Sequence, residues 1–170
     1  FYVHDGDDDG GATETFSYVA TDGTNQDTGS AGTIAISINA VDDTPPVEVN
    51  DAATINEGAT SSNLNILDND TDSPDNGSLS VYSVGGTAFA SLTASTDTTY
   101  TSGDGYKQVA GTYGTLYIKA DGTSFYVHDG DDDGGATETF SYVATDGTNQ
   151  DTGSAGTIAI SINAVDDTPP

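Results

Sequence analysis

The chain has 170 residues, with 28 Asp and Glu against 2 Lys and Arg, and its formal net charge is -26. A chain this acidic lacks the clustered cations that nucleic-acid binding needs, and anionic membranes repel it. It contains no Cys, so disulfides cannot offset the self-repulsion of the carboxylates, and the composition points to bound cations.

Apolar residues recur with a period of two, which predicts strands and no helix. The clearest segment places Ile158, Ile160 and Ile162 on one face of a strand, and the pair Asp121-Gly122 predicts a tight hairpin turn. In chain order we expect strands at 52–56, 62–67, 78–84, 88–93, 106–110, 114–119, 123–128, 139–143 and 157–163. This pattern predicts an all-β fold, a two-sheet Greek-key β-sandwich with immunoglobulin-like or cadherin-like topology.

Residues 1–46 are identical to residues 125–170, so the chain contains a tandem repeat with a period of 124 residues. A unit of this length is large enough to be a domain with its own core. Near-identical modules in a row are typical of filaments, stalks and adhesins, and enzymes seldom need them.

Paired prolines at the end of each copy interrupt sheet pairing and predict the boundary between modules. We therefore expect 47–170 to form one full 124-residue repeat and 41–51 to be the inter-module linker. Residues 1–46 are then the C-terminal part of a preceding identical repeat, incomplete alone because so short a fragment buries too little surface. We expect 125–170 rather than 1–46 to complete the segment 47–124.

Several segments carry a family resemblance. Residues 111–127, 138–147 and 155–170, preceded by 50–52, 57–58 and 66–72, resemble the VCBS-type, cadherin-like repeats of giant calcium-dependent bacterial adhesins of the RTX type. The resemblance implies a calcium-rigidified extender domain with no active site, secreted by type I export to the bacterial cell surface. Its partners would be neighbouring identical repeats in a monomeric array, with no small-molecule substrate and no direct membrane contact.

The strongest metal motif is the acidic loop between two expected strands. Asp129, Asp131 and Asp133, followed by Gly134, match the first half of an EF-hand loop, in which Gly permits the sharp turn. The match then ends, and Glu138 is a candidate extra ligand. The alternative is a solvated acidic turn. The first copy, Asp5, Asp7 and Asp9, would behave likewise only in a complete module.

A second run of acids follows the second expected strand. Asp68, Asp70, Asp72 and Asp75 lie close together around a turn, so several oxygens can face one cation, and we expect calcium there. The alternative is a loop in which Asp and Asn accept hydrogen bonds from their own backbone amides.

A third group surrounds the module boundary. It comprises Asp42 and Asp43 before the boundary, then Asp51 and Glu57 after it. The family resemblance implies that such residues share calcium at the junction, which would stiffen the joint. The alternative is that Asp42 and Asp43 only keep a semi-rigid linker soluble.

Catalytic chemistry is poorly represented. His128 lies beside the acidic loop, but zinc would need further His or Cys ligands. Four tyrosines, Tyr113, Tyr117, Tyr126 and Tyr142, form either a sugar-stacking platform or, more often in such sheets, core packing. Lys107 and Lys119 are the only candidates for an isopeptide cross-link.

Two functions follow. The first is a spacer that binds several Ca²⁺ ions per repeat, projects a distal binding region and supports adhesion and biofilm formation. The second is a repeat that itself binds a glycan or another cell-surface partner, where weak sites gain avidity by repetition.

Overall fold

The computed structural model describes residues 1–6, 10–25, 29, 31–39, 41, 44–73, 77–150 and 154–166. The chain divides into two compact units, Phe1–Asp42 and Asp43–Pro170, and this division lies within the expected linker 41–51. Five of the candidate metal ligands lie outside the described residues: Asp7, Asp9, Asp42, Asp43 and Asp75.

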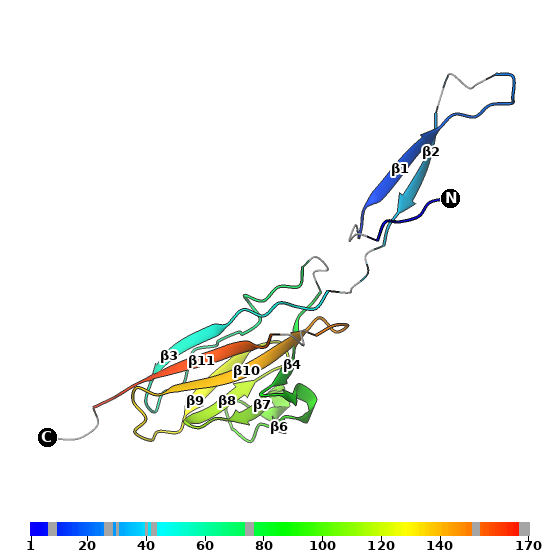
Figure 1. Ribbon diagram of the computed structural model, residues 1–170. Helices are drawn as coiled ribbons and strands as arrows, with labels where there is room; N and C mark the ends of the chain where they lie inside the picture. Colours follow the sequence, from blue (N-terminus) through cyan, green and yellow to red (C-terminus); the bar gives the residue numbers. More distant parts are fainter. Residues whose placement is uncertain are drawn as a thin grey trace. The chain divides into compact units, whose positions relative to one another are not determined.

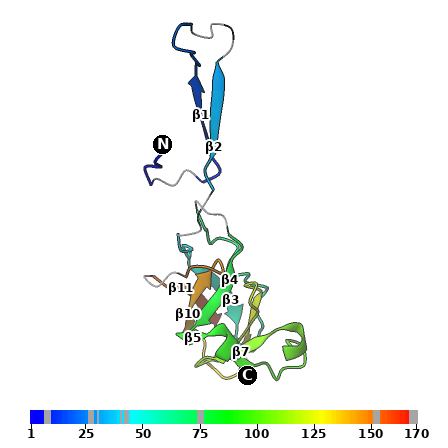
Figure 2. The same cartoon turned by 90° about the vertical axis from the view of Figure 1, so that its right-hand side faces the viewer.

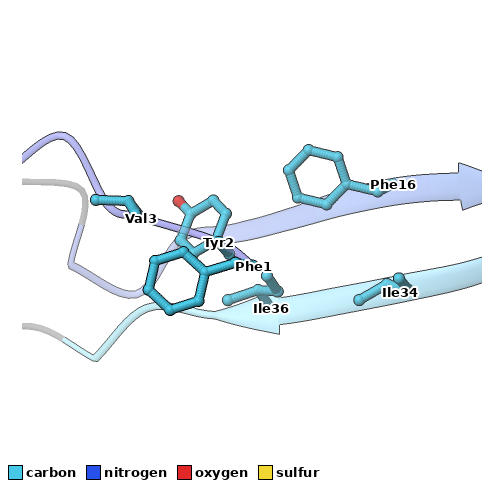
Figure 3. A pocket seen from close by; sticks show the side chains of 6 residues that line it. All are labelled: Phe1, Tyr2, Val3, Phe16, Ile34 and Ile36. Atoms are coloured by element: carbon cyan, nitrogen blue, oxygen red, sulfur yellow. The ribbon is translucent and has the colours of Figure 1, made fainter.

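Unit 1 contains one antiparallel hairpin (Figure 1). Its strands are β1 (Thr13–Tyr18) and β2 (Gly32–Ser37). Phe16 pairs with Ile34 across the hairpin, so both side chains lie on the same face (Figure 3).

Unit 2 contains two sheets in a sandwich-like arrangement (Figures 1 and 2). The first has the order β3 (Asp51–Asn56), β11 (Gly156–Asn163), β10 (Thr137–Thr145), β4 (Ser80–Val84) and β5 (Thr87–Ala88). The second has the order β6 (Thr93–Ala94), β7 (Lys107–Ala110), β8 (Gly114–Ile118) and β9 (Ser124–His128). β3 and β11 run parallel, and the other pairs are antiparallel.

The fold is therefore all-β, as the period-two pattern predicts. The only helices among the described residues are two 3-10 turns, η1 (Phe89–Ser91) and η2 (Ser102–Asp104). Within that part of the chain, no helix is long and apolar enough to cross a membrane.

The core lies between the two sheets. Ile158, Ile160 and Ile162 of β11 are buried, which confirms the alternation predicted for this strand. They belong to one apolar cluster with residues of the second sheet, including Leu116 and Tyr126. The predicted hairpin at Asp121-Gly122 is also confirmed, because it joins antiparallel β8 and β9 and Gly122 has a φ of 85°.

Two predicted strands are wrong. Residues 62–67 form no strand, although Leu64 and Ile66 donate backbone hydrogen bonds to Ser124 and Gly122 beside β9. Asn65 has a φ of 42°, a left-handed conformation that interrupts an extended strand. Residues 88–93 contain η1 instead of a continuous strand.

Part of the expected linker is packed against unit 2. Val47 and Thr71 exchange backbone hydrogen bonds of 2.7 and 3.1 Å, and Pro46 is fully buried. The chain therefore enters the unit along the acidic segment that follows residue 66, which brings the start of β3 to that segment.

Candidate functional site

The described candidate ligands of unit 2 gather mainly at the two ends of β3. Asp51 begins this strand, and Glu57 directly follows its last residue. At about 3.3 Å per strand residue, the two lie about 20 Å apart. One ion therefore cannot bind both side chains within one module, and the structure separates these two members of the expected junction group.

The first group, which we call the Asp70 cluster, consists of Asp51, Asp68, Asn69 and Asp70. Asp51 hydrogen-bonds the Asn69 side chain and lies near the charges of Asp70 and Asp68. Asp70 is buried, and its Oδ1 accepts a 2.7 Å hydrogen bond from the Val49 amide. The structure therefore joins Asp51 to the 68–70 segment.

The Tyr142 hydroxyl lies at the centre of the Asp70 cluster. It is 3.0 and 3.1 Å from the two carboxylate oxygens of Asp70 and 3.0 Å from the carbonyl oxygen of Ile66. One hydroxyl carries one proton, so it can donate to only one of these acceptors at a time. Asp51 Oδ2 is buried and has no hydrogen-bond partner among the described residues. The cluster thus holds more oxygen acceptors than donors.

The pKa values of the cluster reflect this excess of oxygen acceptors over donors. Burial, followed by the charge of Asp70, raises the pKa of Asp51 to about 6. Burial also raises the pKa of Asp70 above its usual value. Burial and the two carboxylates raise the pKa of the Tyr142 hydroxyl, so it remains a donor. Converging, poorly compensated carboxylate oxygens are what a hard cation such as Ca²⁺ binds.

Asp72 lies beside the Asp70 cluster. Its side chain is buried, its Oδ2 accepts a hydrogen bond from the Gly77 amide, and its Oδ1 has no partner among the described residues. Asp70, Asp72 and Gly77 line one pocket. The predicted grouping of Asp70 with Asp72 is therefore consistent with the structure.

The second group, the Asp133 cluster, consists of Glu57, His128, Asp129, Asp131 and Asp133. Ligand atoms of His128, Asp129 and Asp133 lie within 4.8 Å of one another. Burial, then the charge of Asp129, raises the pKa of Asp133. The Asp131 amide donates to Asp129 Oδ1 at 3.1 Å. Asp129 and Asp133 thus bring their carboxylates together with His128, whereas Asp131 is not in that group and its amide occupies an oxygen of Asp129.

His128 is buried and faces this cluster from the end of β9. Its Nδ1 accepts hydrogen bonds from the amides of Gly58 and Gly130, at 3.1 and 3.0 Å. The proton of the neutral ring therefore lies on Nε2, which is 4.0 Å from Asp133 Oδ2. With Nδ1 occupied as an acceptor, His128 orients the loop, and the aspartates provide the oxygens for a cation.

Two details of the acidic loop differ from the expectation. Gly134 does not provide the sharp turn, because the left-handed glycines are Gly130 and Gly135. Gly134 instead lies so close to Ala164 that a side chain would not fit. Glu57 lies beside this loop, because its carboxylate interacts with the backbone of Asp133 and Gly134. Its Oε2 also accepts a 2.7 Å hydrogen bond from the Val165 amide, which is the largest cause of its lowered pKa.

Glu138 is not part of the His128–Asp129–Asp133 group. Its buried Oε2 accepts hydrogen bonds from the amides of Thr112 and Tyr113, at 2.6 and 2.8 Å. These bonds give it a structural role in holding the turn before β8. In unit 1, Asp5 is exposed and lies 4.0 Å from His4.

The two lysines lie away from both clusters. Lys107 donates to the Leu92 carbonyl oxygen, and Lys119 Nζ lies 4.6 Å from the centre of the Tyr106 ring. Ion pairs within 4.0 Å in the described part of the chain involve only histidines. Neither cluster is therefore neutralised by a lysine of this chain.

The four tyrosines named above do not form one platform. Tyr126 and Tyr142 are buried in the core, and Tyr113 packs against it. Tyr117 lies in a separate aromatic group, where the Tyr100 ring stacks on Tyr117 and Phe125 at 5.0 and 4.9 Å. The role of Tyr100 was not predicted, because a tyrosine in a loop gives no periodic signal.

Comparison with known proteins adds little. No family model matches the chain, and no curated protein matches it. Among solved structures, the endo-fucoidan hydrolase MfFcnA4 from glycoside hydrolase family 107 and a variant of it both align with a TM-score of 0.33, at 13% and 11% identity. The alignments cover 95% of this chain and 20% of those chains, so the chain spans about a fifth of their length. A likeness this low carries no argument about fold or function.

Proposed function

We propose that the chain is a calcium-stabilised extender repeat of a long bacterial cell-surface adhesin, with no catalytic role. Its function is to hold a distal binding region away from the cell as one of many modules in a secreted, monomeric array. The partners of each module are then its neighbours of the same sequence.

The Asp70 cluster carries this proposal. Asp51 and Asp70 lie close together and share the Tyr142 hydroxyl as a donor, and the pKa of Asp51 is raised to about 6. Without a cation, this arrangement costs stability at neutral pH, because at least one buried carboxylate ionises against another. A bound Ca²⁺ removes that cost and links the start of β3 to residues 68–70.

The Asp133 cluster supports the same function at the other end of β3. The module enters beside the Asp70 cluster through Val47 and leaves beside the Asp133 cluster through Val165. Cations at both clusters would hold the entering and leaving segments against the module. A stalk needs this, because loose segments at each joint would let it bend.

A Greek-key topology of the immunoglobulin or cadherin type is part of the proposal. Its support is that β3 adds parallel to β11, whereas β10 pairs with both β11 and β4. Residues 60–66 also bond to β9, across the sandwich from β3. The chain thus passes from one sheet to the other and back, as in Greek-key sandwiches.

Thermal unfolding of the full chain tests the function. Extracellular-type sites with a Kd of about 10⁻⁴ to 10⁻³ M would add about 1–2 kcal/mol per site at about 5 mM Ca²⁺. We expect the Tm to rise by several degrees over a chelated sample, and magnesium at the same concentration to have little effect. The variant Asp51→Asn/Asp70→Asn should lose part of this rise, whereas Asp97→Asn/Asp104→Asn, outside both clusters, should keep it. An equal Tm with calcium and with chelator would contradict the proposal.

A further inference from the structure

Strand β3 forms one edge of the first sheet (Figure 1). Its strand partner in the described part of the chain is β11, where Ala53 lies opposite Ile160 in a parallel ladder. In such a ladder, every second residue directs its amide and carbonyl groups to the partner strand. The Glu57 amide donates to the Asn163 carbonyl oxygen, so the odd-numbered residues face β11. The even-numbered residues therefore direct their amide and carbonyl groups to the open edge.

The open edge of β3 is exposed. Ala52, Thr54 and Asn56 are exposed residues. Apart from the ladder with β11, the described residues form no backbone hydrogen bond with Ala52 or Thr54. Of the backbone groups of Asn56, only the carbonyl oxygen is used, because it accepts from the Ala59 amide at 3.0 Å. Amide and carbonyl groups at such an edge pair readily with another extended chain.

This edge also lacks the features that usually prevent such pairing. Natural edge strands carry a central charge, a proline or a bulge. From Ala52 to Asn56, β3 has no charged residue and no proline, and its register with β11 contains no shift. The edge can therefore accept a short extended segment as an additional strand.

Both ends of this edge are acidic. The Asp70 cluster lies at the start of β3 and contains the carboxylates of Asp51, Asp68 and Asp70. The Asp133 cluster lies at its end, with four carboxylates that include that of Glu57. One Ca²⁺ ion cancels two negative charges, so each cluster keeps a net negative charge even with an ion bound.

The charge determines which partner fits. A second copy of this chain has a formal net charge of -26, so edge-to-edge pairing of two copies brings like charges together. A cationic extended segment is instead attracted at both ends, because its Lys or Arg side chains meet carboxylates. The two clusters lie about 20 Å apart, a length of about six residues along a strand.

We propose that the open edge of β3 binds an extended segment of a partner protein that carries Lys or Arg at two positions about six residues apart. The segment adds a strand to the first sheet by pairing with Ala52, Thr54 and Asn56. Its cationic ends lie against the Asp70 and Asp133 clusters. This partner site goes beyond the spacer function and needs no bound calcium.

A synthetic peptide tests the proposal by fluorescence polarisation with the full chain. The probe is dye-labelled Lys-Val-Thr-Val-Thr-Val-Lys with blocked ends, a strand-forming sequence with lysines six positions apart. Two further peptides carry N-methyl groups, one on its valines and the other on its threonines. Since the amides of a strand point alternately to its two edges, each of these peptides has one edge blocked.

We expect saturable binding of the unmethylated peptide. One methylated peptide should bind about tenfold more weakly, whereas the other should keep most of the affinity, because only one edge of the added strand pairs with β3. If methylation of the two edges has equal effects, or if no peptide binds saturably, the proposal is overturned.

Two variants at one position assign the pairing to β3. Thr54→Pro removes an amide that faces the open edge and leaves the ladder with β11 in place, whereas Thr54→Val keeps this amide. We expect Thr54→Pro to weaken binding about fivefold and Thr54→Val to leave it unchanged. Equal affinities of the two variants, with Tm values that show both to be folded, would place the peptide elsewhere and contradict the proposal.

Charge variants test the choice of partner without altering the backbone. Asp68→Asn/Asp131→Asn removes one exposed acid from each cluster and should weaken binding a few-fold at about 50 mM salt, whereas Asp97→Asn/Asp104→Asn should not. The charge-reversed peptide Glu-Val-Thr-Val-Thr-Val-Glu should not bind. Equal binding of the two peptides would overturn a cationic partner.

Measurements with chelator separate this site from the calcium sites. The peptide should bind in chelator and a few-fold more weakly at about 5 mM Ca²⁺, because the ions reduce the charge of both clusters. Peptide binding that fails while calcium still raises the Tm would overturn only the partner site. Peptide binding in chelator without any calcium effect on the Tm would support the partner site and contradict only the spacer function.

Discussion

The two copies of the repeated segment have one sequence and two environments. In both copies, Thr and Asp side chains close the same turn, because Asp22 Oδ1 accepts from Asn25 and Asp146 Oδ1 accepts from Asn149. Ile34 is nevertheless 52% exposed, whereas Ile158 is fully buried. The comparison shows that the segment itself determines its turn and register, and that residues 47–124 provide its burial.

The largest expected effect concerns this difference in burial. Ile158→Ala removes a side chain that is 0% exposed, so it leaves a cavity and should lower the free energy of unfolding by about 2–5 kcal/mol. The same change in the first copy, Ile34→Ala, should cost less than about 0.5 kcal/mol. Urea denaturation of both variants measures the difference. Equal losses would mean that the first copy is buried in solution.

A smaller effect on stability is expected for Tyr142, whose hydroxyl lies at the centre of the Asp70 cluster. Tyr142→Phe removes the hydroxyl that contacts Asp70 and the Ile66 carbonyl oxygen, which should cost about 1–3 kcal/mol in calcium-free buffer. Tyr18→Phe makes the same change where the side chain is 52% exposed, and it should be nearly neutral. A neutral Tyr142→Phe would contradict the hydrogen-bonded arrangement described above.

The smallest expected effect is a pH dependence of stability that comes from Asp51, a residue outside the repeated segment. The pKa of Asp51 is about 6 in the folded chain, against a reference value of 3.8. Between these values the folded state binds more protons than the unfolded state, so this group's contribution to stability falls as pH rises. Without calcium, Asp51→Asn should therefore stabilise the chain by about 1 kcal/mol at pH 7.5 and by almost nothing at pH 4.

Calcium should reverse the sign of the effect of Asp51→Asn on stability, because a cation favours the ionised carboxylate. With saturating Ca²⁺ at pH 7.5, we expect Asp51→Asn to unfold more easily than the unchanged chain. Comparing Tm values at the two pH values, with calcium and with chelator, measures both signs. If Asp51→Asn shifts the Tm equally under all four conditions, Asp51 has no coupled carboxylate neighbour.

Local signals predicted much of the fold. The alternating isoleucines of β11 and the Asp-Gly turn before β9 depend on neighbouring residues, and both appear as expected. The strand expected at 62–67 is wrong for a reason that is only partly local, because Asn63 Oδ1 accepts hydrogen bonds from the amide of Asn65 nearby and from that of the distant Ser124. These bonds replace regular strand pairing, and hydrophobicity gave no indication of them.

The site was harder to predict because its partners are distant in sequence. The carboxylate runs at 68–72 and 129–133 are visible as motifs, but the assignment of Asp51 to one and Glu57 to the other depends on the length and path of β3. Tyr142 lies 72 positions from Asp70, so spacing gave no sign of their contact. Glu138 follows the acidic loop closely in sequence, yet its Oε2 binds the amides of Thr112 and Tyr113.

The most direct test of the calcium account is a binding measurement on the full chain by isothermal titration calorimetry. The account predicts saturable Ca²⁺ binding with a Kd of about 10⁻⁴ to 10⁻³ M, accompanied by proton release near pH 6 because Asp51 must ionise. Asp51→Asn/Asp70→Asn should abolish that proton release. No saturable binding at millimolar calcium, or binding and proton release that this variant leaves unchanged, would contradict it.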